Sequence, residues 1–203
     1  YRSYAKINSY LNVMSKLDNG YHEILTHFQI IDLYDEISFK ESDFLQIDSN
    51  EKTIKDNNSI TKAIKWFNEK YGINQQFEVK IKKSIPIGAG LGGGSSNAAI
   101  AIRFLAKFHN IQIKDIDNTE IALALGADVP VFVHKKSCYA SGIGDILGKN
   151  SFNSSEYLLI CPHIFVSTQK LYKSNFLEFQ NFENKEINSF LSVLIKENKE
   201  FKD

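Results

Sequence analysis

A run of glycines near the middle of the chain is the residue pattern with the most specific chemistry. Five glycines fall within seven positions: Gly88, Gly90, Gly92, Gly93 and Gly94. Because glycine has no Cβ atom, backbone N–H groups in such a run can approach an anion closely, and the N-terminus of a following helix adds partial positive charge. Ser95 and Ser96 stand where that helix is expected to begin, so we expect them to cap it and to contact phosphate. The run predicts a phosphate-binding loop.

Two standard nucleotide-binding loops fit this run less well. Gly88, Gly90 and Gly93 satisfy the G-x-G-x-x-G spacing of dinucleotide-binding proteins. However, more than 80 residues with several expected strands precede the run, and no acidic residue closes a clear second strand about 20 residues later. A Walker A loop needs lysine after its last glycine, where Ser95 stands. An NAD-dependent oxidoreductase is therefore a distant alternative.

The elements upstream of the loop are expected to form a sheet and one helix. Residues 5–14 and 21–39 alternate loosely between apolar and polar types on either side of an Asp-Asn-Gly turn, which predicts paired strands. Apolar residues recur at helical spacing over 60–71, with Asn58-Ser59 as the cap and Gly72 as the stop. The alternation of residues 77–81 predicts a half-buried strand that leads directly into the glycines.

Helices and short strands are expected downstream of the loop. Residues 97–109 have the composition of a buried helix, and Asp117 with Glu120 resembles a capping box for a second helix that ends at Gly126. The sequence turns polar over residues 149–156, which places a domain boundary there and predicts domains at 1–150 and 151–203. The remaining expected elements are strands at 129–133, 138–143 and 157–161 and an amphipathic helix near 187–195.

The composition is typical of a globular chain with no bulk charge. The 203 residues include 24 Lys and Arg against 24 Asp and Glu, so neither nucleic acid nor an anionic membrane is an expected partner. Hydrophobic residues make up 43% of the chain, enough for a sizeable core. No apolar run approaches the roughly 20 residues of a membrane span, and no signal peptide opens the sequence, so we expect a cytoplasmic protein. The two cysteines and five histidines lack metal-ligand spacing, so no resident metal is expected.

Four collinear motifs resemble a known enzyme family. The segment PIGAGLGGGSSNAA (86–99) is similar to the ATP-binding motif of the GHMP kinase superfamily, which phosphorylates small alcohols and acids. Three further motifs narrow the resemblance to the 4-diphosphocytidyl-2-C-methyl-D-erythritol kinases of the non-mevalonate isoprenoid pathway: AKIN (5–8), DNGYHE (18–23) and LGADVPVF (125–132). The resemblance runs from about residue 5 to about residue 172.

The resemblance implies a fold and a reaction. The fold would be α+β with the two-domain GHMP architecture: an N-terminal α/β domain of the ribosomal protein S5 domain 2-like type over 1–150 and a partial C-terminal α+β domain over 151–203. The enzyme would use ATP with Mg2+ to phosphorylate the 2-hydroxyl group of its cytidylyl substrate. Family members are longer, and their further glycine-rich segment has no counterpart after Tyr172, so we expect a C-terminally truncated copy.

The resemblance also implies a role for individual residues. Lys6 and Asp128 match the catalytic pair: the carboxylate would accept the hydroxyl proton and the ammonium would neutralise charge on the γ-phosphoryl group. The substrate would be bound by Asn8 near this pair, by Tyr21, His22 and Phe28 at the cytosine, and by Thr168 and Tyr172 from the second domain. The residues implied in ATP binding are Pro86, Ile87, Gly88, Ala89, Gly90, Leu91, Gly92, Gly93, Gly94, Ser95 and Ser96.

Other interpretations stay open beside this one. Taken alone, Asp128 after a helix-ending glycine is more often a turn residue, Lys6 a solvated charge, and Phe28 or Tyr172 a core residue. Position 172 is commonly Phe in the family, so Tyr172 departs from the pattern while it keeps the ring. The alternative functions are a truncated nucleotide-binding module without catalysis and another GHMP small-molecule kinase.

Overall fold

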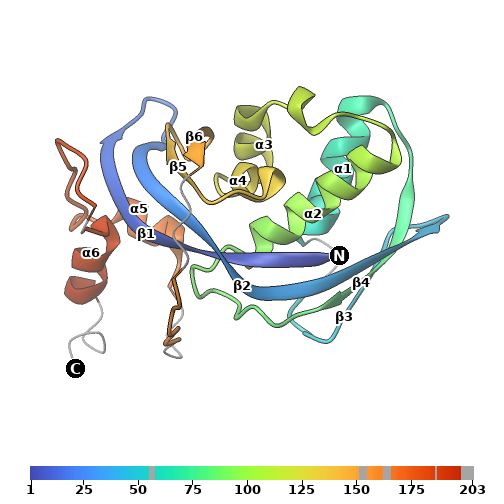
Figure 1. Cartoon of the computed structure of the whole chain (residues 1–203), viewed down its shortest axis with the longest axis horizontal. Helices are drawn as coiled ribbons and strands as arrows, with labels where there is room; N and C mark the ends of the chain where they lie inside the picture. Colours follow the sequence, from blue (N-terminus) through green and yellow to red (C-terminus); the bar gives the residue numbers. More distant parts are fainter. Residues whose placement is uncertain (55–57, 151–154, 162–165, 186, 198–203) are drawn as a thin grey trace.

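A mixed six-stranded sheet forms the frame of the protein. The computed structural model describes residues 1–54, 58–150, 155–161, 166–185 and 187–197 (Figure 1). The central strand β2 pairs in antiparallel fashion with β1, β4 and β5, while β3 runs parallel to β4 and β6 antiparallel to β5. The strands are β1 (Arg2–Lys16), β2 (His22–Ser42), β3 (Gln46–Ser49), β4 (Gln76–Lys82), β5 (Cys138–Ser141) and β6 (Ile146–Asn150).

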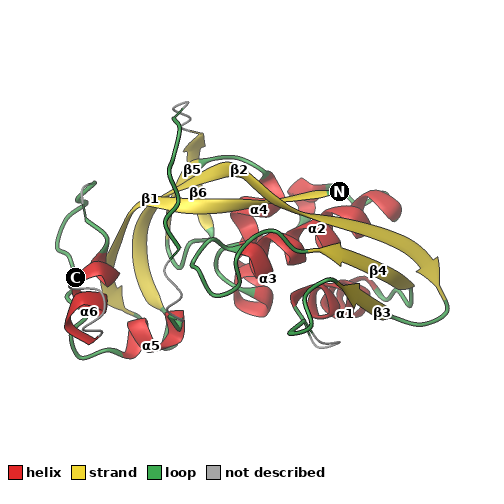
Figure 2. Ribbon diagram, turned by 90° about the horizontal axis from the view of Figure 1, so that it is seen from below, coloured by secondary structure: helices red, strands yellow, loops and turns green. Residues whose placement is uncertain are grey.

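The helices form two groups. Four of them cover one face of the sheet (Figure 1): α1 (Ser59–Tyr71), α2 (Gly93–Phe108), α3 (Asn118–Leu125) and α4 (Val129–His134). The other two lie beside the β1–β2 hairpin, at the opposite end of the molecule from α1 (Figure 2): α5 (Thr168–Lys173) and α6 (Ser189–Glu197). No helix in the described ranges combines the length and apolar character needed to cross a membrane.

Each helix group has its own apolar core. The main core lies between the sheet and α1, α2 and α4, and its large buried members include Phe28, Ile37, Phe67, Phe77, Val79, Ile102 and Leu105. A smaller cluster holds α5 and α6 on β1 and β2, and it consists of Leu11, Val13, Ile24, Leu171, Phe190 and Val193. Burying such side chains is worth about 1.5–3 kcal/mol each, so these two clusters fix where both helix groups lie.

Most predicted elements upstream of residue 126 are confirmed. The two long strands flank the predicted turn, with Lys16 opposite His22. The Asn58 side chain caps α1 by accepting from the N–H groups of Ile60 and Thr61, and Gly72 follows the last turn. Asp117 caps α3 by accepting from Glu120 N–H at 2.8 Å. Local capping and hydrophobic periodicity therefore predict this part of the chain well.

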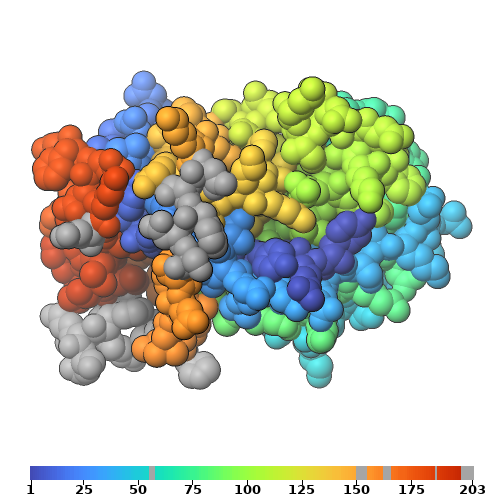
Figure 3. All heavy atoms as spheres, viewed as in Figure 1, coloured from blue at the N-terminus to red at the C-terminus, as the bar shows by residue number. Residues whose placement is uncertain are grey.

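Two predicted strands are wrong. Residues 129–133 belong to helix α4, where Val129, Val131 and Val133 are fully buried. A short apolar run that is buried on all sides carries no periodicity to separate strand from helix. Residues 157–161 form no strand among the described residues, and they stand exposed on the surface (Figure 3). Residues 151–154 of the predicted boundary lie outside the described residues, so the division into two domains stays a prediction.

Candidate active site

The glycine-rich loop connects β4 to α2 and presents its backbone at the start of that helix. Gly88, Gly90 and Gly92 have φ angles of 75°, 74° and 70°. At Gly92 a Cβ atom would lie 2.8 Å from the Phe132 ring and 3.1 Å from Lys6 Cε, so only glycine fits. Because Gly92 has no side chain, the loop backbone can lie close to the Lys6 side chain.

Helix α2 begins earlier than the sequence predicts. Its first residue is Gly93, its N-cap is Gly92, and no side chain caps it. The predicted capping by Ser95 and Ser96 is therefore wrong. The Ser96 hydroxyl is buried and hydrogen-bonded to the Ser3 hydroxyl at 2.8 Å, which turns it away from the loop. Glycines leave the first backbone N–H groups of α2 without a side-chain cap, as an anion site requires.

The loop is bonded directly to strand β1. Lys6 N–H donates to the Leu91 carbonyl at 3.0 Å. The Lys6 ammonium lies 3.2 Å from Asp128 Oδ2 and donates to Asn8 Oδ1 at 2.6 Å. The Lys6 side chain is almost fully buried, whereas 32% of the Asp128 side chain is exposed. The structure thus brings together the two residues that the sequence proposes as the catalytic pair.

A buried hydrogen-bond chain fixes the orientation of Asn8. Its Nδ2 donates to Thr26 Oγ1 at 2.7 Å, and that hydroxyl donates to the Tyr10 carbonyl at 2.7 Å. Thr26 is fully buried. Because the amide nitrogen is engaged by Thr26, the amide oxygen is left facing Lys6. In the sequence, Thr26 carries no signal that separates it from an ordinary strand residue.

One cavity of about 800 Å³ joins the loop, the ion pair and helix α5. It is lined at one end by the glycines and by the start of α1, and at the other by α5. Among the residues proposed from the sequence, those on its wall are Lys6, Asn8, Asp128, Thr168, Tyr172 and the loop residues 86–95. Its size suits a nucleotide together with a second small molecule.

Two stacked rings stand at the α5 end of the cavity. The rings of His22 and Tyr172 lie 4.9 Å apart at an interplanar angle of 24°, and Phe190 packs edge-on against Tyr172 at 4.8 Å. Burial lowers the pKa of His22, with a further contribution from Lys16. Burial and the charge of Asp128 raise the pKa of Tyr172. Both rings are therefore favoured in their neutral forms at neutral pH, which suits contact with a flat uncharged base.

Three of the proposed substrate residues lie off the cavity wall. Tyr21 is exposed in the β1–β2 turn, and His22 reaches the cavity only through its stack on Tyr172. Phe28 is 1% exposed in the main core, with its ring centroid 5.7 Å from the Lys6 ammonium. The buried Phe28 ring is therefore not available to stack on a base. Its ring supports Lys6 from below.

Other wall residues were missed in the sequence. Lys83 lines the cavity at the end of β4, and Asn58 and Ser59 line it at the start of α1. Lys83 directly follows Lys82 at the end of β4 and looks like one more exposed charge, and Asn58 is recognised only as a helix cap. Within the described ranges no group of three or more His, Cys, Asp or Glu side chains could hold a metal ion.

Comparisons with known proteins agree with this geometry. Residues 58–136 match the family described as GHMP kinases N terminal domain. The 4-diphosphocytidyl-2-C-methyl-D-erythritol kinase of Francisella philomiragia is 40% identical over 199 residues, which cover 96% of this chain and 72% of the relative. The kinase of the same name from Francisella tularensis subsp. holarctica is 43% identical over 178 residues, which cover 86% of this chain and 65% of the relative.

A solved structure extends the likeness to the fold. The crystal structure of a 4-(cytidine 5'-diphospho)-2C-methyl-D-erythritol kinase matches the whole chain with a TM-score of 0.74 and 25% sequence identity, and the chain covers 79% of it. The chain thus spans between 65% and 79% of the length of these three relatives. Its mixed sheet, its helices and its glycine-rich loop form a GHMP kinase α+β fold. The chain belongs to the 4-diphosphocytidyl-2-C-methyl-D-erythritol kinase family.

Proposed function

We propose that this chain transfers the γ-phosphoryl group of ATP, bound with Mg2+, to the 2-hydroxyl group of 4-diphosphocytidyl-2-C-methyl-D-erythritol. The observation that carries the proposal is the ion pair of Lys6 and Asp128 at 3.2 Å, set beside a glycine-rich loop that is hydrogen-bonded to the Lys6 backbone. A carboxylate, a fixed cation and a phosphate-binding loop are the parts that phosphoryl transfer to an alcohol requires.

The reacting groups follow from this arrangement. The 2-hydroxyl group attacks the γ-phosphorus while Asp128 accepts its proton, and the bond from the γ-phosphorus to the bridging oxygen breaks to release ADP. Lys6 stabilises negative charge on the transferring group, and Asn8 orients the ammonium through its amide oxygen. Mg2+ enters with ATP as part of the substrate and neutralises phosphate charge.

The glycine-rich loop and the stacked rings of His22 and Tyr172 bind the two substrates at opposite ends of the cavity. The N–H groups of residues 87–95, which include the first turn of α2, bind the phosphates of ATP. Tyr172, stacked on His22, and Thr168 at the start of α5 receive the cytosine end of the acceptor. The neutral state of both rings supports this placement.

The test is ADP release by this chain with Mg2+ and ATP, in the presence and absence of the cytidylyl substrate. We expect substrate-dependent release that the Asp128→Asn variant lacks, while Asp48→Asn on the exposed face of β3 serves as the matched control. ATP binding without turnover would instead support a nucleotide-binding module. Phosphorylation of mevalonate or homoserine, with the cytidylyl substrate ignored, would overturn the proposal in favour of another GHMP kinase.

A further inference from the structure

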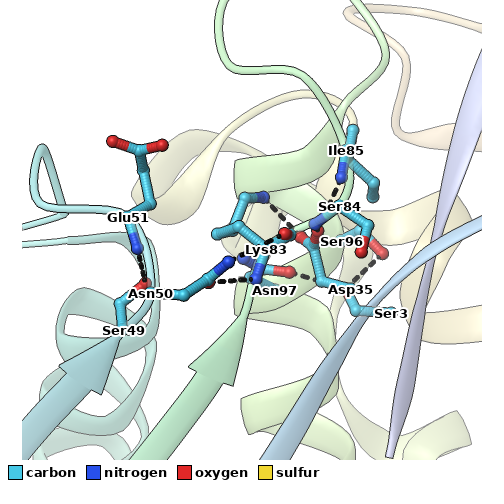
Figure 4. A network of polar contacts seen from close by, with 10 residues as sticks. All are labelled: Ser3, Asp35, Ser49, Asn50, Glu51, Lys83, Ser84, Ile85, Ser96 and Asn97. Carbon is cyan, nitrogen blue, oxygen red and sulfur yellow. Dashed lines mark hydrogen bonds and ion pairs between the residues drawn. The ribbon is translucent and has the colours of Figure 1, made fainter.

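A single buried carboxylate holds the first residues of the glycine-rich loop. Asp35 on β2 is 0% exposed. Its Oδ1 accepts from Ser84 N–H at 2.8 Å and from Ile85 N–H at 2.9 Å, and its Oδ2 forms an ion pair with the Lys83 ammonium. Figure 4 shows these groups converging on Asp35. The carboxylate therefore fixes both the path of the loop and the direction of one lysine side chain.

The backbone of Lys83 is held independently. Lys83 N–H donates to Asn50 Oδ1 at 2.7 Å, and Asn50 Nδ2 donates back to the Lys83 carbonyl at 3.2 Å (Figure 4). The side chain of Lys83 is 8% exposed. With its backbone and its ammonium both fixed, Lys83 has little freedom to choose another direction, and most of its side-chain entropy is already lost before any ligand binds.

The fixed ammonium lies at the phosphate end of the site. A Cβ atom on Gly93, the first residue of α2, would stand 3.2 Å from Lys83 Nζ. Lys83 also lines the same cavity as Lys6 and Asp128. An ammonium has three N–H donors, and among the described residues its hydrogen-bond acceptor is Asp35. Donors are therefore left for an anion at the start of α2, where the helix dipole also favours negative charge.

We propose that Asp35 is a positioning residue for ATP, which acts by holding Lys83 against the phosphate groups. A Walker A loop supplies its phosphate-binding lysine after the last glycine. Here Ser95 occupies that position, and Lys83, the residue directly after β4, reaches the same end of the helix. A buried ammonium is stable only when it is paired, so Asp35 keeps the cation in place while the site is empty. The inference rests on the proposed function.

The experiment compares two neighbouring ion pairs. Three variants disrupt the buried pair: Lys83→Met, Asp35→Asn and the double variant. The matched controls, Lys82→Met and Glu36→Gln, disrupt the exposed pair. Lys82, the last residue of β4, and Glu36 on β2 are the chain neighbours of Lys83 and Asp35. They form an ion pair at 2.9 Å, with 71% and 56% of their side chains exposed. Calorimetry measures the Kd of ATP with Mg2+ and of adenosine for each protein, and urea unfolding checks the folded state.

We expect the loss to depend on the phosphates. Lys83→Met should raise the Kd of ATP roughly tenfold or more, as loss of a charge-assisted hydrogen bond does, with the Kd of adenosine changed less than twofold. Asp35→Asn should raise the Kd of ATP several-fold. Lys83→Met should then have a smaller effect in that background, because Lys83 is no longer held. The two exposed variants should bind ATP as the natural chain does.

The double variant decides the outcome if a single variant fails to fold. It leaves no unpaired buried charge, and the asparagine carbonyl can still accept from the N–H groups of Ser84 and Ile85. Natural ATP affinity in the folded double variant would overturn the inference, as would equal losses for ATP and adenosine. If the natural chain itself fails to bind ATP, the proposed function is overturned. If the natural chain binds ATP and the folded double variant binds it equally well, only this inference is overturned.

Discussion

At the scale of single residues, the Thr26 hydroxyl controls the geometry of the Asn8 amide. Thr26→Val keeps the shape of the side chain but removes the hydrogen bonds to Asn8 Nδ2 and to the Tyr10 carbonyl. We expect about 1–3 kcal/mol lower stability and a kcat reduced roughly tenfold, with KM for ATP unchanged, because the amide that orients Lys6 is no longer fixed. Steady-state kinetics and urea unfolding measure both effects. Thr26→Ser, which keeps the hydroxyl, should behave as the natural chain, and an unchanged kcat in Thr26→Val would contradict this role for Asn8.

His22 should make stability depend on pH. Burial and Lys16 lower its pKa in the folded chain, so the unfolded chain binds a proton first as the pH falls. The contribution of His22 is fully present above the ordinary pKa of about 6.5 and is lost as the pH falls through the lowered value. The free energy of unfolding should therefore decrease between about pH 7 and pH 5. His22→Phe, which keeps a ring on Tyr172, should flatten this slope.

The flattening should be partial, because a second histidine acts in the same direction. Burial lowers the pKa of His134, helped by Lys136 and Arg103. Urea unfolding at several pH values checks both points. An identical slope in the natural chain and in His22→Phe would show that His22 titrates freely in the folded state.

The proposed catalytic pair could be predicted from the sequence, but the residues that position it could not. Lys6 and Asp128 are 122 positions apart, and only the resemblance connects them; the fold then places them 3.2 Å apart. Thr26, Asp35 and Lys83 carry no local signal, because each looks like an ordinary polar position of a strand. Their importance arises from partners far along the chain.

At the scale of elements, the close approach of the loop to Lys6 makes Gly92 sensitive to substitution. Gly92→Ala would meet Phe132 and Lys6 and would strain a left-handed backbone, so we expect stability lower by about 2 kcal/mol and a reduced kcat. Gly94 lies in the first turn of α2. A Cβ atom added there would contact only the Ser59 hydroxyl, at 3.8 Å. Gly94→Ala should leave the free energy of unfolding unchanged or slightly higher. Equal losses in both variants, measured by urea unfolding, would contradict the packing described at Gly92.

Elements were predictable where the pattern is local. The alternation over 77–81 predicts β4, and the Asn58 and Asp117 caps predict the starts of α1 and α3. The α4 segment fails because burial on every side removes periodicity, and its helix depends on packing against α2. The start of α2 at Gly93 could not be read from propensity, since two glycines seldom open a helix unless the surrounding fold holds them.

At the scale of the whole molecule, α5 and α6 complete the cavity only because they dock on the β1–β2 hairpin. Phe190 joins the small apolar cluster and packs on Tyr172. Phe190→Ala should cost about 3 kcal/mol of docking and should raise the Kd of cytidine diphosphate several-fold, because Tyr172 loses its support, with the Kd of ATP little changed. Calorimetry with both nucleotides measures this difference. Leu191→Ala, whose side chain is 55% exposed, is the matched control. Parallel losses for both nucleotides would show that the two ends of the cavity are not independent.

The resemblance implies the α+β class, and local patterns predict most of the elements within the first 126 residues. They do not predict that α5 and α6 pack against the β1–β2 hairpin, because that contact joins Leu11 and Val13 to Phe190 and Val193 across most of the chain. Such long-range packing leaves no periodic trace in either segment. It is nevertheless what brings Thr168 and Tyr172 to the cavity.

The hydrogen bond from Lys6 N–H to the Leu91 carbonyl joins the glycine-rich loop to the strand that carries Lys6 and Asn8. A displacement of the loop on one side of this bond reaches Lys6 and Asn8 on the other. Thermodynamic linkage then makes the two sites reciprocal: whatever factor ATP applies to the affinity for the alcohol, the alcohol applies to the affinity for ATP. Under the proposed function, this backbone contact connects the donor site with the acceptor site.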